Sequence, residues 1–372
     1  MTVPASAEAS GLLTVDLGAL RDNYRQLKAK AGAARCAAVI KADAYGTGAP
    51  QVVQALTAEG CDTFFVATLG EARAVRATAA DVTVYVLDGL FPEAGPAFAE
   101  IGARPVLGSV PEIREWGAFC ASRNEALPAA IHIDTGMNRL GLPPADVAEA
   151  AAESDALGAF ELALVMSHLA CGDEPDHPKN EAQRQAFDTL RAKLPAAPAS
   201  LANSAGVMLG PAYHHDLVRP GVALYGGRAL VEGPNPMKQV VRLEGRIAQI
   251  REVEAGETVG YGATWTFDAP TRVATVPIGY ADGYFRILGS RDGHRGAVAY
   301  IGDHEVPIVG RISMDLITLD VGAVPEERAR RGAMVELLGP HVTVDDVAAL
   351  AQTIGYEVLT SLGRRYQRTY IG

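Results

Sequence analysis

The stretch Val39-Ile40-Lys41-Ala42-Asp43-Ala44-Tyr45-Gly46-Thr47-Gly48 decides the fold, because it joins a buried strand to a helix through a single lysine. The unbroken apolar run Cys36–Ile40 predicts a short buried strand. Lys41 closes that strand, and Tyr45–Gly48 is expected to be a loop into a helix that begins near Pro50. Most lysines at strand ends are solvated surface residues. A poorly solvated one has a lowered pKa and a free amine that can form a Schiff base.

A regular alternation of strands and helices extends from this stretch to about residue 220. The expected strands are Ala37–Ile40, Thr63–Ala67, Val82–Leu87, Arg104–Leu107, Ala129–Ile133, Leu162–Met166, Ala199–Ala202 and Leu217–Val218. Helix-compatible segments lie in most of the intervals, at Gln51–Ala58, Glu71–Thr78, Glu112–Ala121, Ala145–Ala152 and Glu181–Leu194. Eight such steps predict a (β/α)₈ barrel of the TIM type, which usually takes about 200–250 residues. A doubly wound sheet is the alternative.

The pattern changes after Pro234-Asn235-Pro236, so we expect a barrel domain over residues 1–236 and a second, mainly β domain over residues 237–372. Short β-like runs separated by Gly or Pro dominate the second part. One helix is predicted there. Thr343 begins it, Asp346 completes a pair that resembles a capping box, and Gly355 ends it.

Composition limits the classes of partner. The 372 residues are 48% hydrophobic and 21% charged, with a net charge of -11. This balance argues against nucleic acid and anionic membranes, which need clustered Lys and Arg. No apolar run reaches the length of a membrane span, and no signal peptide is evident. The four cysteines are scattered, which is typical of reduced thiols and predicts a cytoplasmic protein with no metal site.

Polar residues are expected to gather where the barrel strands end, because barrel enzymes carry their chemistry there. These positions hold Lys41, Asp134–Arg139, His168, Asn203-Ser204 and Arg219–Val222. The loops after strands 7 and 8 commonly bind a phosphate, and Ser204 with the N–H groups of Gly221 and Val222 suits one. A reactive lysine and a phosphate site together match the two ends of pyridoxal phosphate (PLP).

Each of these residues also has a plainer interpretation. His168 is equally compatible with a hydrogen-bonded structural histidine, Asn203-Ser204 with a helix cap, and Gly221 with a simple turn. Arg219 is harder to explain structurally, because an arginine that ends a buried strand needs a partner. Beneath a pyridine ring it would remain a cation and keep the ring nitrogen unprotonated.

Eight motifs resemble the alanine racemase family, in the family's order, over nearly the whole chain. They are Val39–Gly46, Asp134–Gly141, Met166–Ala170, Asn203–Gly206, Arg219–Gly226, Val259–Trp265, Pro277–Gly283 and Gly310–Asp315. The resemblance implies a PLP enzyme that interconverts L-alanine and D-alanine for peptidoglycan. It also implies a homodimer with shared active sites.

The roles that the resemblance implies fall on individual residues. Lys41 would hold PLP covalently and act as one base, and Tyr261 would be the other base. The remaining cofactor-binding residues would be Tyr45, His168, Asn203, Ser204, Arg219, Gly221, Val222 and Tyr356. The substrate carboxylate would meet Arg139 and the Met314 backbone N–H, with Tyr45, Tyr280 and Tyr356 keeping the pocket small. Tyr261 and Met314 would come from the partner subunit.

One position departs from the family's pattern. His132 stands where many members carry a lysine modified to a carbamate that steadies the arginine, and a histidine cannot form that stable adduct. Three alternatives stay open at this stage. They are a broader racemase that accepts serine, a related PLP-dependent decarboxylase, and the non-enzymatic PLP-homeostasis protein. Arg139 and Met314 argue against the decarboxylase, and the residues after Pro236 argue against the homeostasis protein.

Overall fold

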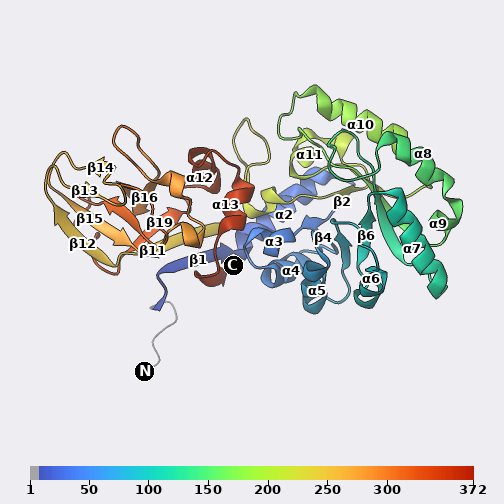
Figure 1. The fold of residues 1–372 in the computed structure, drawn as a ribbon, viewed down its shortest axis with the longest axis horizontal. Coiled ribbons are helices and arrows are strands. Elements are labelled where there is room, and N and C mark those ends of the chain that lie inside the picture. The colour runs from blue at the N-terminus through green and yellow to red at the C-terminus, as the bar shows by residue number, and fades with distance from the viewer. Residues whose placement is uncertain (1–7) are drawn as a thin grey trace. The chain divides into compact units, whose positions relative to one another are not determined.

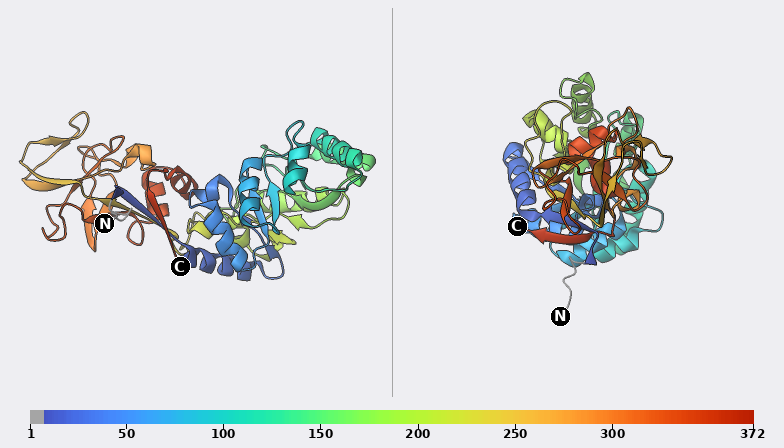
Figure 2. Two further views of the ribbon diagram at one scale, coloured as in Figure 1. Left: turned by 90° about the horizontal axis from the view of Figure 1, so that it is seen from below. Right: turned by 90° about the vertical axis from the view of Figure 1, so that its left-hand side faces the viewer.

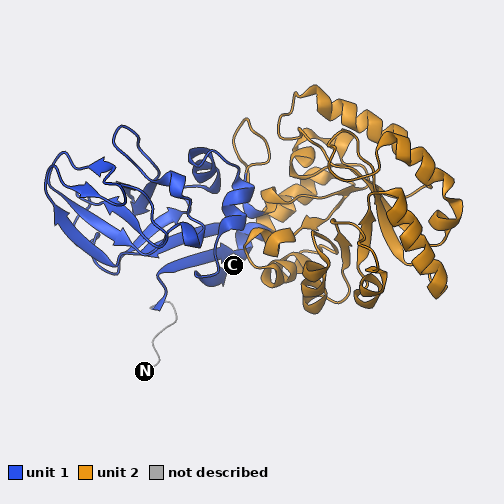
Figure 3. Ribbon diagram, in the orientation of Figure 1, with its two compact units in different colours: residues 1–20, 225–227, 238–372 blue, residues 21–224, 228–237 orange. Residues whose placement is uncertain are grey.

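The computed structural model describes residues 8–372, which form two compact units (Figure 1, Figure 3). Unit 1 contains the described residues up to Leu20, residues 225–227 and residues 238–372; unit 2 contains residues 21–224 and 228–237. Each unit has its own buried core. In the described part of the chain, no helix is both long and apolar enough to cross a bilayer.

Unit 2 is built on parallel strands. Seven of them pair in chain order from β3 to β9. Their bounds are β3 (Ala38–Val39), β4 (Thr63–Val66), β5 (Thr83–Val86), β6 (Arg104–Leu107), β7 (Pro128–His132), β8 (Glu161–Met166) and β9 (Ala199–Ser200). The strands read as short apolar runs because both of their faces are buried, as in other parallel sheets.

Two further strands close the sheet into a barrel. β2 (Arg35–Cys36) pairs with β10 (Leu217–Val218), and Ala37 N–H donates to Val218 O at 3.0 Å just before β3 begins. On the other side, Arg219 N–H donates to Ala202 O at 2.8 Å, which joins β10 to the end of β9. The predicted eight-stranded barrel is confirmed. A doubly wound sheet would have left two edges open.

Helices cover the outside of this barrel (Figure 1), and Figure 2 shows the same outer layer from two further sides. Their bounds are α2 (Leu17–Ala31), α4 (Ala49–Ala58), α5 (Leu69–Thr78), α6 (Gly95–Ile101), α7 (Val110–Arg123), α8 (Pro144–Ala152), α9 (Ser154–Gly158), α10 (Pro178–Arg191) and α11 (Ser204–Leu209). Thr68 and Ser109 cap α5 and α7 by accepting from the backbone N–H three residues on. These caps fix where the helices begin, and hence the length of the loops at the strand ends.

Unit 1 is mainly β, as predicted. Its largest sheet has the order β17-β16-β19-β11-β1-β20, and β12-β15-β18 and β13-β14 form smaller sheets. The bounds are β1 (Gly11–Asp16), β11 (Val241–Arg246), β12 (Gln249–Val253), β13 (Thr258–Val259), β14 (Trp265–Thr266), β15 (Thr271–Val276), β16 (Val298–Ile301), β17 (His304–Pro307), β18 (Ile317–Asp320), β19 (Met334–Leu338) and β20 (Gln367–Ile371). β1, from the start of the chain, lies between β11 and β20.

The prediction of one helix from Thr343 to Gly355 was wrong at its end. Thr343 and Asp346 form the expected capping box, but the helix, α12 (Val344–Leu350), stops before Gly355. Gln352 adopts a left-handed φ of 56°, and Thr353 N–H returns to Ala348 O, which terminates the helix. Gly355 instead begins α13 (Gly355–Ser361).

Candidate active site

Lys41 follows the end of β3 and begins α3 (Lys41–Tyr45), in which the four residues after the lysine are left-handed, with φ of 54–55°. The loop was expected at Tyr45–Gly48, and the turn that precedes it was not predicted; the next helix begins at Ala49, beside the expected Pro50. Each residue other than glycine pays roughly 1–2 kcal/mol for this conformation, which must therefore be held by its surroundings. Lys41 is half-buried. Burial lowers the pKa of its amine, and the nearby Arg139 cation lowers it further.

Arg219 is buried at the end of β10 and has no carboxylate partner within residues 8–372. Its guanidinium donates to Ser167 O at 2.6 Å and to Ser200 Oγ, and lies 3.5 Å from His168 Nδ1. Burial lowers the pKa of Arg219 to about 9, so the group is still a cation at pH 7. Burial first, and then the Arg219 charge, holds the pKa of His168 well below its usual range, so His168 is neutral.

Ser204, Gly221 and Tyr45 form a small polar cradle beside the lysine loop. Ser204 Oγ accepts from Gly221 N–H at 2.8 Å and from Ala223 N–H at 3.3 Å, which leaves the hydroxyl proton to donate elsewhere. A Cβ on Gly221 would lie 2.4 Å from Tyr45 Oη, so only glycine allows this approach. Asn203 caps α11 by accepting from Gly206 N–H at 2.9 Å, and Val222 is buried.

These groups suit PLP. Hydroxyls and backbone around Gly221 fit a phosphate, and Lys41 offers an amine of lowered pKa. Arg219 supplies a buried positive charge that no acid in the described part of the chain neutralises. An arginine buried without an anion is costly unless something else interacts with it. The residues present therefore fit the group that the sequence predicts.

Asp134 organises the loop that carries Arg139. Its buried carboxylate accepts the backbone N–H groups of Gly136, Met137 and Asn138 at 2.8–3.0 Å. Within residues 8–372 the exposed Arg139 side chain has no hydrogen bond or ion pair. Its guanidinium is therefore available to an anion.

His132 cannot supply that anion. Burial first, and then the positive charge of Arg219, lowers the pKa of His132 to about 4, so its imidazole is neutral at pH 7.

The other predicted site residues belong to unit 1 and present large exposed side chains. Tyr261 is 70% exposed, Met314 53%, Tyr280 42% and Tyr356 37%.

Two of these residues are held together by backbone contacts. Tyr280 N–H donates to Ser313 O at 3.1 Å, and Ala281 N–H donates to Met314 O at 3.0 Å. A Cβ on Gly279 would lie 2.3 Å from Met314 O, so the glycine permits this packing. The loops of Tyr280 and Met314 thus form one structural element.

Arg365 joins the same two loops, and sequence reasoning missed it. Its Nε lies 2.6 Å from Asp282 Oδ1, and its Nη1 lies 2.8 Å from Asp315 Oδ1. The buried Asp282 also accepts Gly279 N–H at 2.9 Å. The only sequence signal for this ion network is that Asp282 lies in the motif Pro277–Gly283 and Asp315 in the motif Gly310–Asp315.

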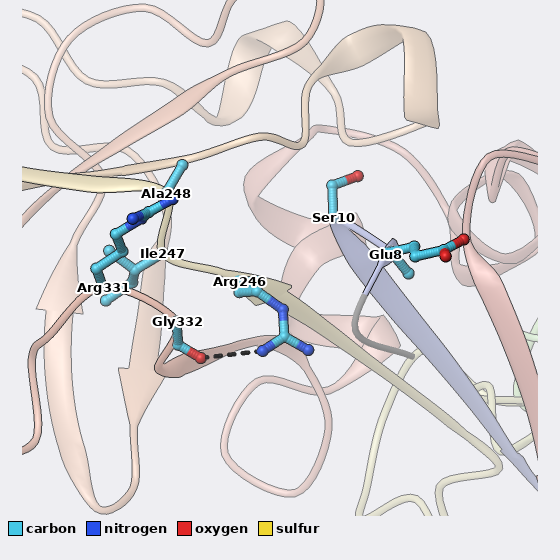
Figure 4. A pocket seen from close by; sticks show the side chains of 8 residues that line it. Glu8, Ser10, Arg246, Ile247, Ala248, Arg331 and Gly332 are labelled. Carbon is cyan, nitrogen blue, oxygen red and sulfur yellow. Dashed lines mark hydrogen bonds between the residues drawn. The ribbon is translucent and has the colours of Figure 1, made fainter. Parts of the chain in front are cut away.

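A pocket of about 510 Å³ lies elsewhere in unit 1 (Figure 4). It is lined by Glu8, Ser10, Arg246, Ile247 and Arg331, among others, and Arg246 Nη1 donates to Gly332 O at 3.3 Å. None of the predicted site residues lines it, so it is not the predicted catalytic site.

Family models match both parts of the chain. The model described as "Alanine racemase, N-terminal domain" matches residues 15–229, and "Alanine racemase, C-terminal domain" matches residues 240–370. Together they span both compact units.

Individual relatives agree with these matches. The chain is 53% identical over 367 residues to a Methylobacterium nodulans protein named alanine racemase, covering 99% of this chain and 98% of that protein. It is 50% identical to a Mesorhizobium japonicum protein named "Alanine racemase, catabolic", covering 99% and 96%.

A solved structure extends the similarity to three dimensions. The alanine racemase of Bartonella henselae, described as having covalently bound pyridoxal phosphate, has a TM-score of 0.92 and 40% identity. The match covers 98% of this chain and 100% of that one.

Proposed function

This chain belongs to the alanine racemase family, and we propose that it interconverts L-alanine and D-alanine with PLP as its cofactor. The observation that carries this proposal is Arg219, a buried cation with no acidic partner among residues 8–372, at the same end of the barrel as Lys41. Because it keeps its own proton, Arg219 would leave the pyridine nitrogen unprotonated, so the ring would absorb less negative charge, which favours return of the proton over transamination.

Lys41 would hold the cofactor covalently through Nζ. Tyr45, Ser204, Gly221, Val222 and Tyr356 would surround its phosphate. Asn203 would contribute to the cofactor site beside Ser204, and His168 would lie beside Arg219. When bound, PLP withdraws electrons from the α-carbon of an attached amino acid and acidifies its proton. The protein's own residues would position the cofactor and the substrate and transfer the proton.

Two bases would serve the two faces of the α-carbon. Lys41 Nζ would take the proton of D-alanine, and Tyr261 Oη would take that of L-alanine. In each direction the protonated form of the other base would then deliver a proton to the opposite face. The lowered pKa of Lys41 brings its amine closer to the pH at which it can act as a base.

Arg139 and the Met314 N–H would hold the substrate carboxylate. Retaining the carboxylate is the reason to prefer a racemase over a decarboxylase, which expels it. Tyr45, Tyr280 and Tyr356 would leave room for a methyl side chain. A broader racemase that accepts serine is the second candidate, because one hydroxyl added to a small pocket is weakly discriminated.

A cytoplasmic homodimer would complete the site. The exposure of Tyr261, Met314 and Tyr280 supports this, since the second domain, residues 237–372, would offer them to the barrel of a partner. Mixing inactive Lys41→Ala and Tyr261→Ala protomers should then restore one competent site in two. No recovery after verified subunit exchange would place both bases in one chain.

The experiment that tests the reaction uses deuterated solvent. Each enantiomer of a panel of amino acids is scored for chiral inversion, α-proton exchange and CO₂ release. Tyr261→Phe keeps the ring but loses the hydroxyl. It should still exchange the proton of D-alanine, while exchange from L-alanine falls by roughly 10²–10⁴. Equal loss for both enantiomers would refute the two-base assignment, and CO₂ release would replace the racemase with a decarboxylase.

The physiological direction is a separate part of the proposal. The resemblance implies supply of D-alanine for peptidoglycan, whereas the relative from Mesorhizobium japonicum is named catabolic. Deleting the gene decides between them. A requirement for added D-alanine supports the biosynthetic role, and loss of growth on alanine alone supports the catabolic one.

A further inference from the structure

The carboxylate of Glu71 connects two neighbouring loops at the mouth of the barrel. Glu71 is the third residue of α5, and its Oε2 accepts from Ala67 N–H at 2.8 Å and from Thr68 N–H at 3.3 Å as part of the capping box. Its Oε1 accepts from Ala42 N–H at 2.6 Å. One side chain therefore caps its own helix and holds the loop of the preceding strand.

Glu112 has the same arrangement farther round the barrel. It is the third residue of α7, and its Oε2 accepts from Gly108 N–H and Ser109 Oγ, both at 2.8 Å. Its Oε1 accepts from Leu90 N–H at 2.8 Å, again in the loop of the preceding strand. The two glutamates occupy equivalent positions. Glu71 completes a capping box through Thr68 N–H, whereas Glu112 accepts from the Ser109 hydroxyl, and their Oε1 atoms hold different loops.

Ala42 is the residue directly after Lys41 and the first of the left-handed residues of α3. Some hydrogen bonds of this turn come from within residues 40–49, such as Ala44 N–H to Ile40 O at 2.9 Å and Ala49 N–H to Asp43 Oδ1 at 2.8 Å. Glu71 adds a bond from outside the segment, directly after Lys41. A charged acceptor makes it one of the stronger bonds available to a backbone N–H.

We propose that Glu71 is a positioning residue for Lys41, which fixes the left-handed turn through Ala42 N–H so that the lysine amine stays directed at the cofactor. The inference rests on the proposed function, because it assumes that Lys41 holds PLP. Glu71 need not touch the cofactor itself.

The charges around Lys41 support this arrangement. Burial first, and then the Arg139 cation, lowers the pKa of the lysine, whereas the Glu71 and Asp88 carboxylates raise it. The negative charge of Glu71 therefore partly offsets the lowering of the Lys41 pKa by burial and by Arg139.

The test compares Glu71→Ala with Glu112→Ala in the PLP-loaded protein. Each variant loses one cap and one bond between loops, so both should lose similar stability. Hydrogen exchange at the Ala42 amide should rise roughly 10–100-fold in Glu71→Ala, as expected for the loss of one hydrogen bond to a charged group. It should stay unchanged in Glu112→Ala, where exchange at Leu90 rises instead.

A second measurement reports how firmly Lys41 holds PLP. Hydroxylamine displaces PLP from an amine, and the loss of visible absorbance gives the rate. Glu71→Ala should release PLP several-fold faster than the unmodified protein, and Glu112→Ala should not. Glu71→Gln keeps one carbonyl acceptor and should recover part of the protection at Ala42. If Glu71→Ala does not fold, Glu71→Gln serves for both measurements against Glu112→Gln.

Unchanged exchange at Ala42, or equal release of PLP from both alanine variants, would overturn the inference and leave Glu71 as a helix cap only. Failure of the proposed function looks different. In that case the unmodified protein would bind no PLP or would not invert alanine, whether or not hydrogen exchange at the Ala42 amide changes in Glu71→Ala.

Discussion

Gly221→Ala is the substitution that the structure predicts most sharply. The backbone at Gly221 is not in the left-handed region, so alanine is allowed by conformation and only space opposes it. The new Cβ would lie 2.4 Å from Tyr45 Oη and 3.1 Å from its Cζ. Real Cβ atoms essentially never come closer than 3.0 Å, so the buried hydroxyl must retreat by several tenths of an ångström.

That displacement should appear as weaker cofactor binding. Loss of one hydrogen bond from a hydroxyl to a phosphate costs about 1.5–3 kcal/mol, which corresponds to roughly 10–100-fold in the dissociation constant of PLP. The constant is measured by titrating PLP into cofactor-free protein and following the visible absorbance. Thermal unfolding is recorded in parallel.

Gly158→Ala is the matched control, because its Cβ would meet nothing within 4 Å. It should bind PLP like the unmodified protein. If Gly221→Ala folds and binds PLP equally well, the cradle of Tyr45, Ser204 and Gly221 does not hold the phosphate. If both variants lose affinity alike, the effect is not specific to the cradle.

The remaining predictions concern charge. Arg219→Glu should lower racemisation and raise transamination products; equal falls in both would make Arg219 purely structural. His132 has a pKa lowered from 6.5 to about 4, so the unfolded chain binds more protons. The free energy of unfolding should therefore fall as pH drops from 6.5 to 4, by up to about 1.4 kcal/mol per pH unit; an unchanged profile in His132→Gln would contradict this. Bicarbonate should not raise activity, and a carbamylated lysine found beside Arg139 by mass spectrometry would disprove that expectation. Arg365→Met should raise the KM for alanine, because it frees the Met314 loop; a fall in thermal stability with unchanged KM would limit Arg365 to a structural role.

Periodicity in the sequence predicts the barrel well because its signal is local. Runs such as Arg104–Leu107 and Leu217–Val218 are strands with the predicted bounds. The first strand is less regular. It splits at Ala37 into β2, which pairs with β10, and β3, which pairs with β4. Contact with the β10 side continues, because Val39 N–H donates to Pro220 O at 2.9 Å. Apolar residues alone cannot show such a break, because the run is buried on both sides of it.

The loop after Lys41 shows a conformation that local sequence signals do not predict. The left-handed residues are Ala42, Asp43, Ala44 and Tyr45, with no glycine among them to signal positive φ. Local propensity disfavours this turn at Ala42, Ala44 and Tyr45, and only Asp43 is of a type that tolerates it. Its conformation is set by tertiary contacts, so the sequence identifies the lysine but not the path of the chain around it.

Glu71 illustrates why such residues escape sequence reasoning. Thr68 and Glu71 satisfy a local rule, the capping box, and that rule explains both residues without reference to any other part of the chain. The capping box uses one carboxylate oxygen, and the second oxygen is free to reach the preceding loop, as Glu112 does with Leu90. Only the register of the strands places Ala42 opposite Glu71. A residue with a complete local explanation therefore still carries a long-range function, and the barrel geometry decides which of two equivalent glutamates lies beside the reactive lysine.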